Sequence, residues 1–157
     1  VNTASPSGIY GNIGQSNYGA AKAGIAAFTI ITAMELTKYG VTVNCLAPGA
    51  YTRMTKDLPG FAGMDEETQE KMAPRWIAVT TAWLCSAAAQ NVTGRIFDIV
   101  GQRVGIAEQW KLGPTAMQTD DPADMTDVIA GLMAEAALNS DMGGHPTEGP
   151  GRPGKTI

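Results

Sequence analysis

Cysteine and histidine are scarce in this sequence, whose 157 residues include two cysteines and one histidine. Cys45 and Cys85 are too few for a disulfide framework, and they lie too far apart along the chain for a short metal-binding motif. One histidine leaves a zinc site or a Ser-His-Asp triad with almost nothing to be built from. We therefore expect no metal centre and no histidine-based hydrolase.

Positive charge and long apolar runs are lacking as well. The chain has 11 Lys and Arg residues against 15 Asp and Glu residues, and no stretch is strongly basic. We therefore expect no nucleic-acid partner and no anionic membrane surface as a partner. The longest uncharged run of helical character, between Lys22 and Glu35, is shorter than the ~20 apolar residues that cross a bilayer. No signal-peptide pattern opens the sequence, so the expected location is the cytoplasm.

Short apolar segments alternate with longer helical ones, which is typical of an α/β fold. A strand, a long helix and a second strand in succession predict parallel strands joined by a right-handed crossover. Gly40 is expected to end the long helix, because glycine accepts the left-handed conformation that follows many helices. The expected elements are a strand end at 1–4, a glycine-rich loop at 5–15, a helix at 16–39, strands at 41–47 and 95–100, and helices at 65–72 and 74–89.

The character of the chain changes after Gly101. One further helix is expected at 122–138, capped by Asp121 and rich in Ala and Met. Residues 139–157 contain five glycines and three prolines, a composition that predicts disorder. The expected organisation is thus a domain part of alternating strands and helices at 1–105, a helical extension at 106–138 and a disordered tail at 139–157.

Tyr18 and Lys22 are the residues with the clearest chemical potential. Their spacing of four places both side chains on one helix face, one turn apart. A phenol is almost wholly protonated at neutral pH and makes a poor base, but a neighbouring ammonium group stabilises the phenolate. Such a phenol can take a proton from an alcohol or return one to a ketone. The alternative is a chance pair, because this spacing of Tyr and Lys also arises by accident.

Ser5, thirteen residues before Tyr18, strengthens the catalytic interpretation. The run Asn2-Thr3-Ala4-Ser5-Pro6-Ser7-Gly8, followed by Gly11-Asn12-Ile13-Gly14-Gln15-Ser16-Asn17-Tyr18 and Lys22, resembles the active-site segment of the short-chain dehydrogenase/reductase family. The resemblance is specific over the first 55 residues, where it includes Pro48-Gly49 and Thr52-Arg53-Met54-Thr55. It continues weakly to about residue 105.

The resemblance implies roles for individual residues. Tyr18 would be the general acid/base, Lys22 would stabilise its phenolate and bind the nicotinamide ribose, and Ser5 would orient the substrate oxygen. Ser7 is the weaker candidate for that last role, because its distance from Tyr18 is two residues short.

The turn Pro48-Gly49-Ala50-Tyr51-Thr52 resembles the family's contact with the nicotinamide carboxamide. The threonine comes one position earlier than in the commonest pattern, which leaves Thr52 and Thr55 as alternatives. Residues 53–73 lie where the family keeps a mobile substrate lid. The implied cofactor is NAD or NADP, and the residues present do not decide between the two.

Within the family, the segment around Ser5 most resembles the dehydrogenase part of peroxisomal multifunctional enzymes, which act on (3R)-hydroxyacyl thioesters. Bacterial 3-oxoacyl carrier-protein reductases are the nearest alternative. The partners implied are a small-molecule substrate and, for the full-length form, further copies of the protein in a dimer or tetramer.

A dinucleotide-binding enzyme also needs a glycine-rich turn between its first strand and the following helix. The only literal match, at 149–154, lies among prolines with no expected strand before it and no helix after it. We therefore expect the C-terminal half of a doubly wound, parallel-sheet (Rossmann-like) fold, which alone would be inactive and bind no NAD(P)H. The alternatives are a non-catalytic association module and an epimerase or isomerase that keeps its nucleotide bound.

Overall fold

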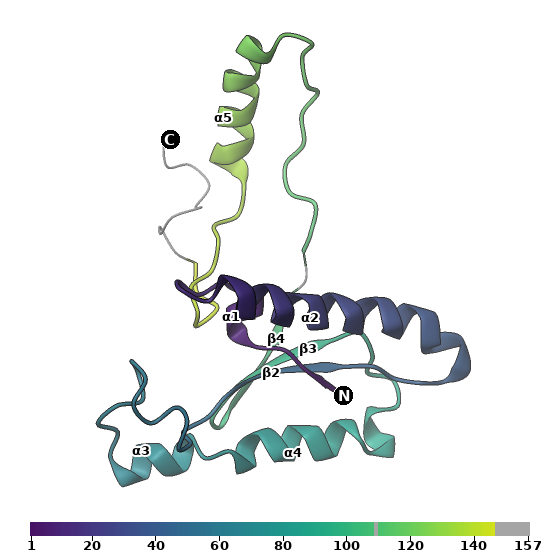
Figure 1. The fold of residues 1–157 in the computed structure, drawn as a ribbon. Helices are drawn as coiled ribbons and strands as arrows, with labels where there is room; N and C mark the ends of the chain where they lie inside the picture. The colour runs from purple at the N-terminus through teal and green to yellow at the C-terminus, as the bar shows by residue number, and fades with distance from the viewer. Residues whose placement is uncertain (109, 147–157) are drawn as a thin grey trace. The chain divides into compact units, whose positions relative to one another are not determined.

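The computed structural model describes residues 1–108 and 110–146 (Figure 1). The chain divides into two units, Val1–Glu108 and Gln109–Ile157. The first unit contains β1 (Asn2–Thr3), α1 (Pro6–Ile9), α2 (Ser16–Leu36), η1 (Thr37–Tyr39), β2 (Cys45–Gly49), α3 (Glu66–Lys71), α4 (Arg75–Leu84), η2 (Ala87–Ala89), β3 (Ile96–Val100) and β4 (Arg103–Ala107). The second contains η3 (Pro122–Asp124) and α5 (Met125–Glu135).

The four strands form one sheet in the order β1-β2-β3-β4. β1, β2 and β3 are parallel, with Cys45 opposite both Asn2 and Ile96, and β4 is antiparallel to β3. The expected α/β fold with parallel neighbouring strands is confirmed. β4 was not expected from the sequence: Gly101, at φ 54°, permits the tight turn that folds β4 back onto β3.

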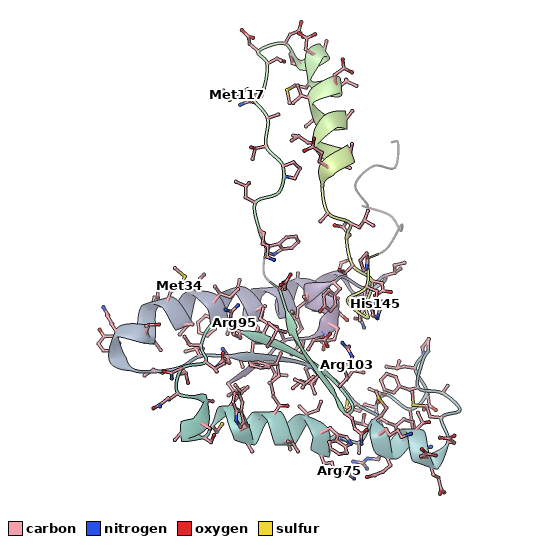
Figure 2. All side chains as sticks on the ribbon, turned by 180° about the vertical axis from the view of Figure 1, so that it is seen from behind. Met34, Arg75, Arg95, Arg103, Met117 and His145 are labelled. Atoms are coloured by element: carbon pink, nitrogen blue, oxygen red, sulfur yellow. The ribbon has the colours of Figure 1, made fainter. Side chains whose placement is uncertain are left out.

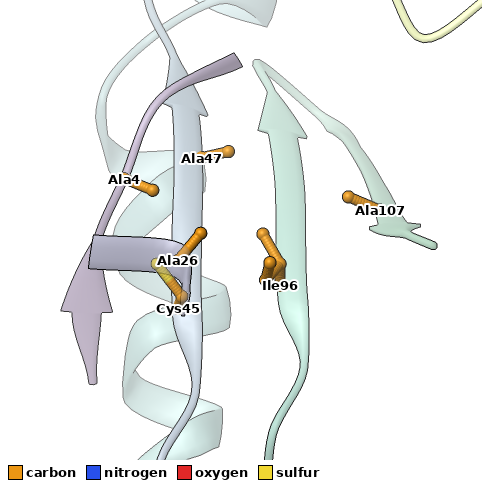
Figure 3. Packing of buried hydrophobic residues seen from close by; sticks show 6 residues of the cluster. All are labelled: Ala4, Ala26, Cys45, Ala47, Ile96 and Ala107. Carbon is orange, nitrogen blue, oxygen red and sulfur yellow. The ribbon is translucent and has the colours of Figure 1, made fainter. Parts of the chain in front are cut away.

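Helices cover both faces of this sheet: α1 and α2 lie on one side and α4 on the other (Figure 1). Successive strand residues point to opposite faces, and the core is accordingly divided in two. The α2 side contains Ala4, Ala26, Cys45, Ala47, Ile96 and Ala107 (Figure 3). The α4 side contains Leu46, Leu84, Ala89, Phe97 and Ile99.

The small residues on the α2 side let the helix backbone lie close to the sheet. Ala26, Thr29 and Ala33 are the buried residues of α2, about one or two turns apart on one face. The helix ends as expected: η1 continues it to Tyr39, and Gly40 follows with φ 70°.

Three expected boundaries in the first unit are wrong. Part of the predicted loop 5–15 forms α1, because Ser5 caps it, accepting a hydrogen bond from Ser7 N at 3.2 Å, and Pro6 suits its first turn. β2 begins at Cys45 rather than at 41. The Asn44 backbone O accepts from Asn2 N at 2.8 Å, but its side chain donates to Val92 O at 2.7 Å, and Val43 N donates to the Thr93 hydroxyl at 3.0 Å rather than to a neighbouring strand. The helix predicted at 74–89 ends at Leu84 and continues after a break as η2.

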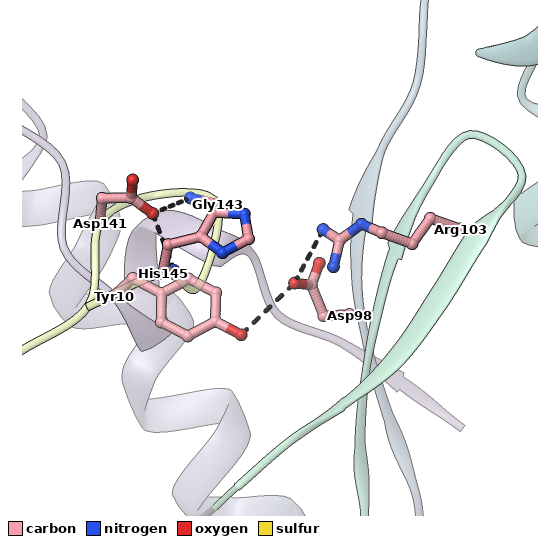
Figure 4. A network of polar contacts seen from close by, with 6 residues as sticks. All are labelled: Tyr10, Asp98, Arg103, Asp141, Gly143 and His145. Atoms are coloured by element: carbon pink, nitrogen blue, oxygen red, sulfur yellow. Dashed lines mark hydrogen bonds and ion pairs between the residues drawn. The ribbon is translucent and has the colours of Figure 1, made fainter. Parts of the chain in front are cut away.

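In the second unit, the helix expected at 122–138 is shorter. Its first turn is the 3-10 helix η3, capped by Asp121, and α5 ends at Glu135. Residues 140–146 form a turn in which the Asp141 carboxylate accepts backbone hydrogen bonds from Gly143 and His145 (Figure 4). These bonds lower the pKa of Asp141. Residues 147–157, with most of the predicted disordered tail and the glycine motif at 149–154, lie outside the described residues.

Helix α2 with η1, Ser16–Tyr39, is long and apolar enough to cross a membrane by length and composition. The helix expected at 16–39 has this length, although the uncharged run within it, between Lys22 and Glu35, is shorter than a membrane span. A core helix of a soluble protein passes the same test, and α2 packs on the sheet. Length and composition are therefore weak evidence for a membrane span.

Candidate active site

The expected site residues on strands lie at one edge of the sheet. Thr3 is opposite Leu46 in the parallel pair β1–β2, and Ala4 N donates to Leu46 O at 2.7 Å. The chain therefore leaves β1 at Ser5 close to the place where β2 ends at Gly49. The carboxyl edge of a parallel sheet is where ligands bind in open α/β folds.

Two glycines bring the Ser5 segment against the helix that carries Tyr18 and Lys22. A Cβ atom added to Gly8 would lie 2.6 Å from Ala23 N and 2.7 Å from the Lys22 Cβ atom. A Cβ atom on Gly19 would lie 3.2 Å from Ser7 O. Only glycine allows α1 to lie this close to the first turns of α2, and this contact brings the three expected catalytic residues into one region.

Tyr18 and Lys22 lie side by side at the start of α2. Lys22 Nζ is 5.7 Å from the centroid of the Tyr18 ring and donates a hydrogen bond to Thr3 O at 3.0 Å. Tyr18 is 44% exposed, and its hydroxyl has no hydrogen-bond partner among residues 1–108 and 110–146. The phenol is thus open to an approaching molecule, with an ammonium group held beside it.

Hydrogen bonding distinguishes Ser5 from Ser7, although both are buried. The Ser7 hydroxyl donates to Gln15 Oε1 at 2.7 Å, so its proton is in use. The Ser5 oxygen accepts from Ser7 N at 3.2 Å, and its own proton has no acceptor in the described part of the chain. Ser5 is therefore the better donor to a substrate oxygen. The acceptor of the Ser7 proton is Gln15, a residue that the sequence did not single out.

Thr52 and Thr55 close the turn after β2. The Thr55 hydroxyl donates to Ala50 O at 2.7 Å, so the 3.0 Å contact between the two hydroxyls uses the Thr52 proton. Thr52 Oγ1 also accepts from the backbone N of Met54 and of Thr55. Both hydroxyl protons are spent within the turn. A contact of Thr52 or Thr55 with the nicotinamide carboxamide stays a prediction. Because both hydroxyl protons are used within the turn, such a contact would be made by backbone groups of the turn.

The segment expected to form the lid is anchored where it returns to the sheet. Tyr51 N donates to Met72 O at 2.8 Å, and Gln102 N donates to Lys71 O at 3.0 Å. Gly101 leaves no room for a Cβ atom against Lys71 O. The end of α3 is therefore fixed on the turn between β3 and β4.

Three further polar residues, Tyr10, Asp98 and Arg103, meet at the middle of β3. Asp98, on β3, is 3% exposed, and its Oδ2 atom accepts from the Tyr10 hydroxyl and from Arg103 Nη2, each at 3.3 Å (Figure 4). Its Oδ1 atom is buried and has no partner in the described residues. Burial, and next the Asp98 charge, raise the pKa of Tyr10 above its ordinary value, which keeps its hydroxyl protonated and able to donate to Asp98. The separation of 88 positions between Tyr10 and Asp98 hides this pairing from any local pattern.

Comparison with known proteins places this arrangement in a family. The family model described as enoyl-(acyl carrier protein) reductase matches residues 1–101. The hydroxyacyl-CoA dehydrogenase ChsB1 of Mycobacterium tuberculosis is 39% identical over 127 residues, which cover 80% of this chain and 38% of that protein. The peroxisomal hydratase-dehydrogenase-epimerase of Neurospora crassa is 35% identical over 130 residues, covering 82% of this chain and 14% of that protein.

A solved structure agrees with the sequence matches. The crystal structure of a short chain dehydrogenase from Mycobacterium avium has a TM-score of 0.74 and 38% identity, covering 88% of this chain and 44% of that one. The expected Rossmann-like fold is thereby confirmed, and the chain spans less than half the length of the relatives it matches. With the family model matching most of the chain and the sheet matching that of a solved member, this chain belongs to the short-chain dehydrogenase/reductase family.

Proposed function

We propose that the protein carrying this chain is an NAD(P)-dependent oxidoreductase that interconverts a 3-hydroxyacyl and a 3-oxoacyl thioester. The observation that carries the proposal is the open Tyr18 phenol with the Lys22 ammonium 5.7 Å from its ring, next to the segment that presents Ser5. The names of the relatives support the substrate class, since one is a hydroxyacyl-CoA dehydrogenase and another a hydratase-dehydrogenase-epimerase.

Each of these side chains has a definite task in the oxidation of an alcohol. The Ser5 hydroxyl donates a hydrogen bond to the substrate oxygen and orients it. Tyr18 Oη takes the hydroxyl proton as the carbonyl forms, and the Lys22 ammonium stabilises the phenolate that does so. In the reduction, Tyr18 returns the proton to the carbonyl oxygen. A nicotinamide, when bound, accepts or supplies the hydride.

The residues at this edge fit the nicotinamide end of a dinucleotide. Lys22 has three N–H donors and uses one of them on Thr3 O, so two remain for ribose hydroxyls. Tyr18 Oη is open beside it. Pro48 and Gly49, at the end of β2, are half-buried and place backbone groups rather than a bulky side chain at the edge. We propose these four residues, with the Thr52 turn, as the nicotinamide-binding part, and NAD or NADP as the cofactor.

The proposal is tested by supplying both epimers of a 3-hydroxyacyl-CoA with NAD⁺ or with NADP⁺. We expect the absorbance of the reduced nicotinamide to rise with the (3R) epimer and one of the two cofactors, and the 3-oxoacyl thioester to be reduced in the reverse assay. No net cofactor turnover with any pair would contradict an oxidoreductase. Interconversion of the two epimers without net turnover would support the epimerase alternative instead.

We also propose that the protein forms homo-oligomers, with the outer face of α2 in the contact. Phe28, Ile31 and Met34 are exposed on α2, at 59%, 54% and 76%, and Figure 2 shows Met34 pointing away from the sheet. Apolar side chains gathered on one exposed face are typical of interaction sites. We expect Met34→Glu to shift the mass measured by light scattering from dimer or tetramer towards monomer, while Lys38→Glu leaves it unchanged. An unchanged mass for Met34→Glu would exclude this face.

A further inference from the structure

Tyr10 is linked directly to the helix that carries Ser5. It follows α1, and its backbone N donates to Pro6 O at 2.8 Å, while Ser5 caps the other end of the same helical turn. A displacement of Tyr10 therefore displaces this turn as a whole. Ser5 and Tyr10 thus stand at the two ends of one hydrogen-bonded turn.

Asp98 is a fixed acceptor for the Tyr10 hydroxyl. It lies in the middle of β3, paired with Ala47 on one side and Gly105 on the other. Arg103, from β4, is paired with the same Oδ2 atom that accepts from Tyr10. Strand pairing and the Arg103 guanidinium thus fix the carboxylate independently of Tyr10.

Stability alone is a weak reason for this buried carboxylate. Removing an ionised group from water carries a penalty that its attraction to a partner often fails to exceed, and well-packed apolar residues of similar volume are frequently as stable. Here the penalty is increased by Oδ1, which is buried without a partner in the described residues. What the charge provides, and an apolar residue could not, is a directional acceptor for the Tyr10 hydroxyl.

The segment between β1 and α2 depends on such an anchor. On one side Gly8 fits against Ala23, and on the other Tyr10 reaches β3. The residues that follow are exposed, with Gly11 and Gly14 at φ 85° and 80°, and the side chain of Gln15 ties them back to Ser7. Without the bond to Asp98, the direction of α1 would be set by its contacts with α2 at Gly8 and Ser7 and by the packing of Ile9, with no directional bond to the sheet from Tyr10.

We propose that Tyr10, Asp98 and Arg103 form a positioning bridge that holds α1 so that the Ser5 hydroxyl points at the substrate oxygen bound by Tyr18. The inference rests on the proposed function for its catalytic consequence. The three residues do not touch the substrate, and they act through Ser5. The bridge itself is a property of the folded chain and is measurable without turnover.

The test compares Tyr10→Phe with Tyr39→Phe in the protein that carries this chain. Both remove one phenol oxygen, and Tyr39 is 68% exposed at the far end of α2. Misplacement of a catalytic group by ~1 Å can lower the rate about 10²-fold. We expect Tyr10→Phe to lower kcat by roughly 10–100-fold with little change in KM, the pattern of a lost transition-state interaction. Tyr39→Phe should leave both constants unchanged.

Hydrogen exchange provides a readout independent of activity. Amides of residues 5–15 should exchange faster in Tyr10→Phe than in the wild type and in Tyr39→Phe, while those of β2 and β3 keep their protection, which shows that the fold persists. Unchanged exchange in 5–15, or a lower melting temperature with kcat unchanged, would overturn the bridge as a positioning device. If the wild type lacks dehydrogenase activity, the proposed function fails, and the exchange comparison still decides whether the bridge holds α1.

Discussion

Tyr18→Phe should lower kcat for the 3-hydroxyacyl thioester by roughly 10²–10⁴-fold, the usual contribution of a positioned general acid or base. The variant keeps the ring, and with it the packing beside Lys22, but it loses the oxygen that takes the proton. Because the Tyr18 hydroxyl has no partner among the described residues and is open to solvent, its removal leaves no buried group unsatisfied. The variant should therefore fold as the wild type does. The rate is followed by the absorbance of the reduced nicotinamide.

The matched control is again Tyr39→Phe, which removes an exposed phenol from the other end of α2. We expect it to retain the wild-type rate. Thermal unfolding of both variants, measured by circular dichroism, should give midpoints close to that of the wild type. A Tyr18→Phe protein with the wild-type kcat would show that the proton passes to another group, and the proposed mechanism would then be wrong.

Gly8→Ala should destabilise the protein by about 1–3 kcal/mol, the range for forcing extra atoms into a packed contact. The new Cβ atom would lie 2.6 Å from Ala23 N and 2.7 Å from Lys22 C. Both are backbone atoms of a long helix, so they cannot move aside as a flexible side chain would. Relief requires α1 to separate from α2, which moves Ser5 away from Tyr18. We therefore expect a loss of kcat together with the loss of stability, the latter measured by urea unfolding.

Gly24→Ala is the matched control for this substitution. Gly24 lies in α2 one residue beyond Ala23, and a Cβ atom there would meet nothing within 4 Å. Alanine in a helix interior is more stable than glycine by about 0.5–1 kcal/mol, so this variant should unfold at a higher urea concentration than the wild type. Equal stabilities for Gly8→Ala and the wild type would mean that α1 does not rest on α2 as the structure has it.

Several parts of the fold and the site follow from the sequence because their signals are local. Tyr18 and Lys22 share a face since four residues make about one helical turn. Gly40 ends the long helix because a left-handed residue there is easy only for glycine. Pro48-Gly49 marks the end of β2 and so the sheet edge where ligands bind in this type of fold. Each of these rests on the spacing or conformational freedom of residues close together in the chain.

Other features depend on groups that only folding brings together. β4 has five residues, one of them arginine and one glycine, and follows β3 after a two-residue turn; its pairing with β3 is what makes it a strand. Ser5 is the better donor to a substrate oxygen because the Ser7 hydroxyl already donates to Gln15 Oε1, a contact that only the fold creates. In the turn after β2, the hydroxyls of Thr52 and Thr55 donate to groups of the same turn. None of these outcomes follows from residue types and spacing.

The sequence by itself determined the family, the α/β order of the elements and the pair Tyr18–Lys22, because periodicity and motif spacing are properties of the chain. The tertiary structure decided how the Ser5 segment is held. Gly8 fits α1 against α2, and Asp98 meets Tyr10 across 88 residues and Arg103 across a tight turn. Strand register and helix packing select these contacts, because they join residues that lie far apart in the sequence.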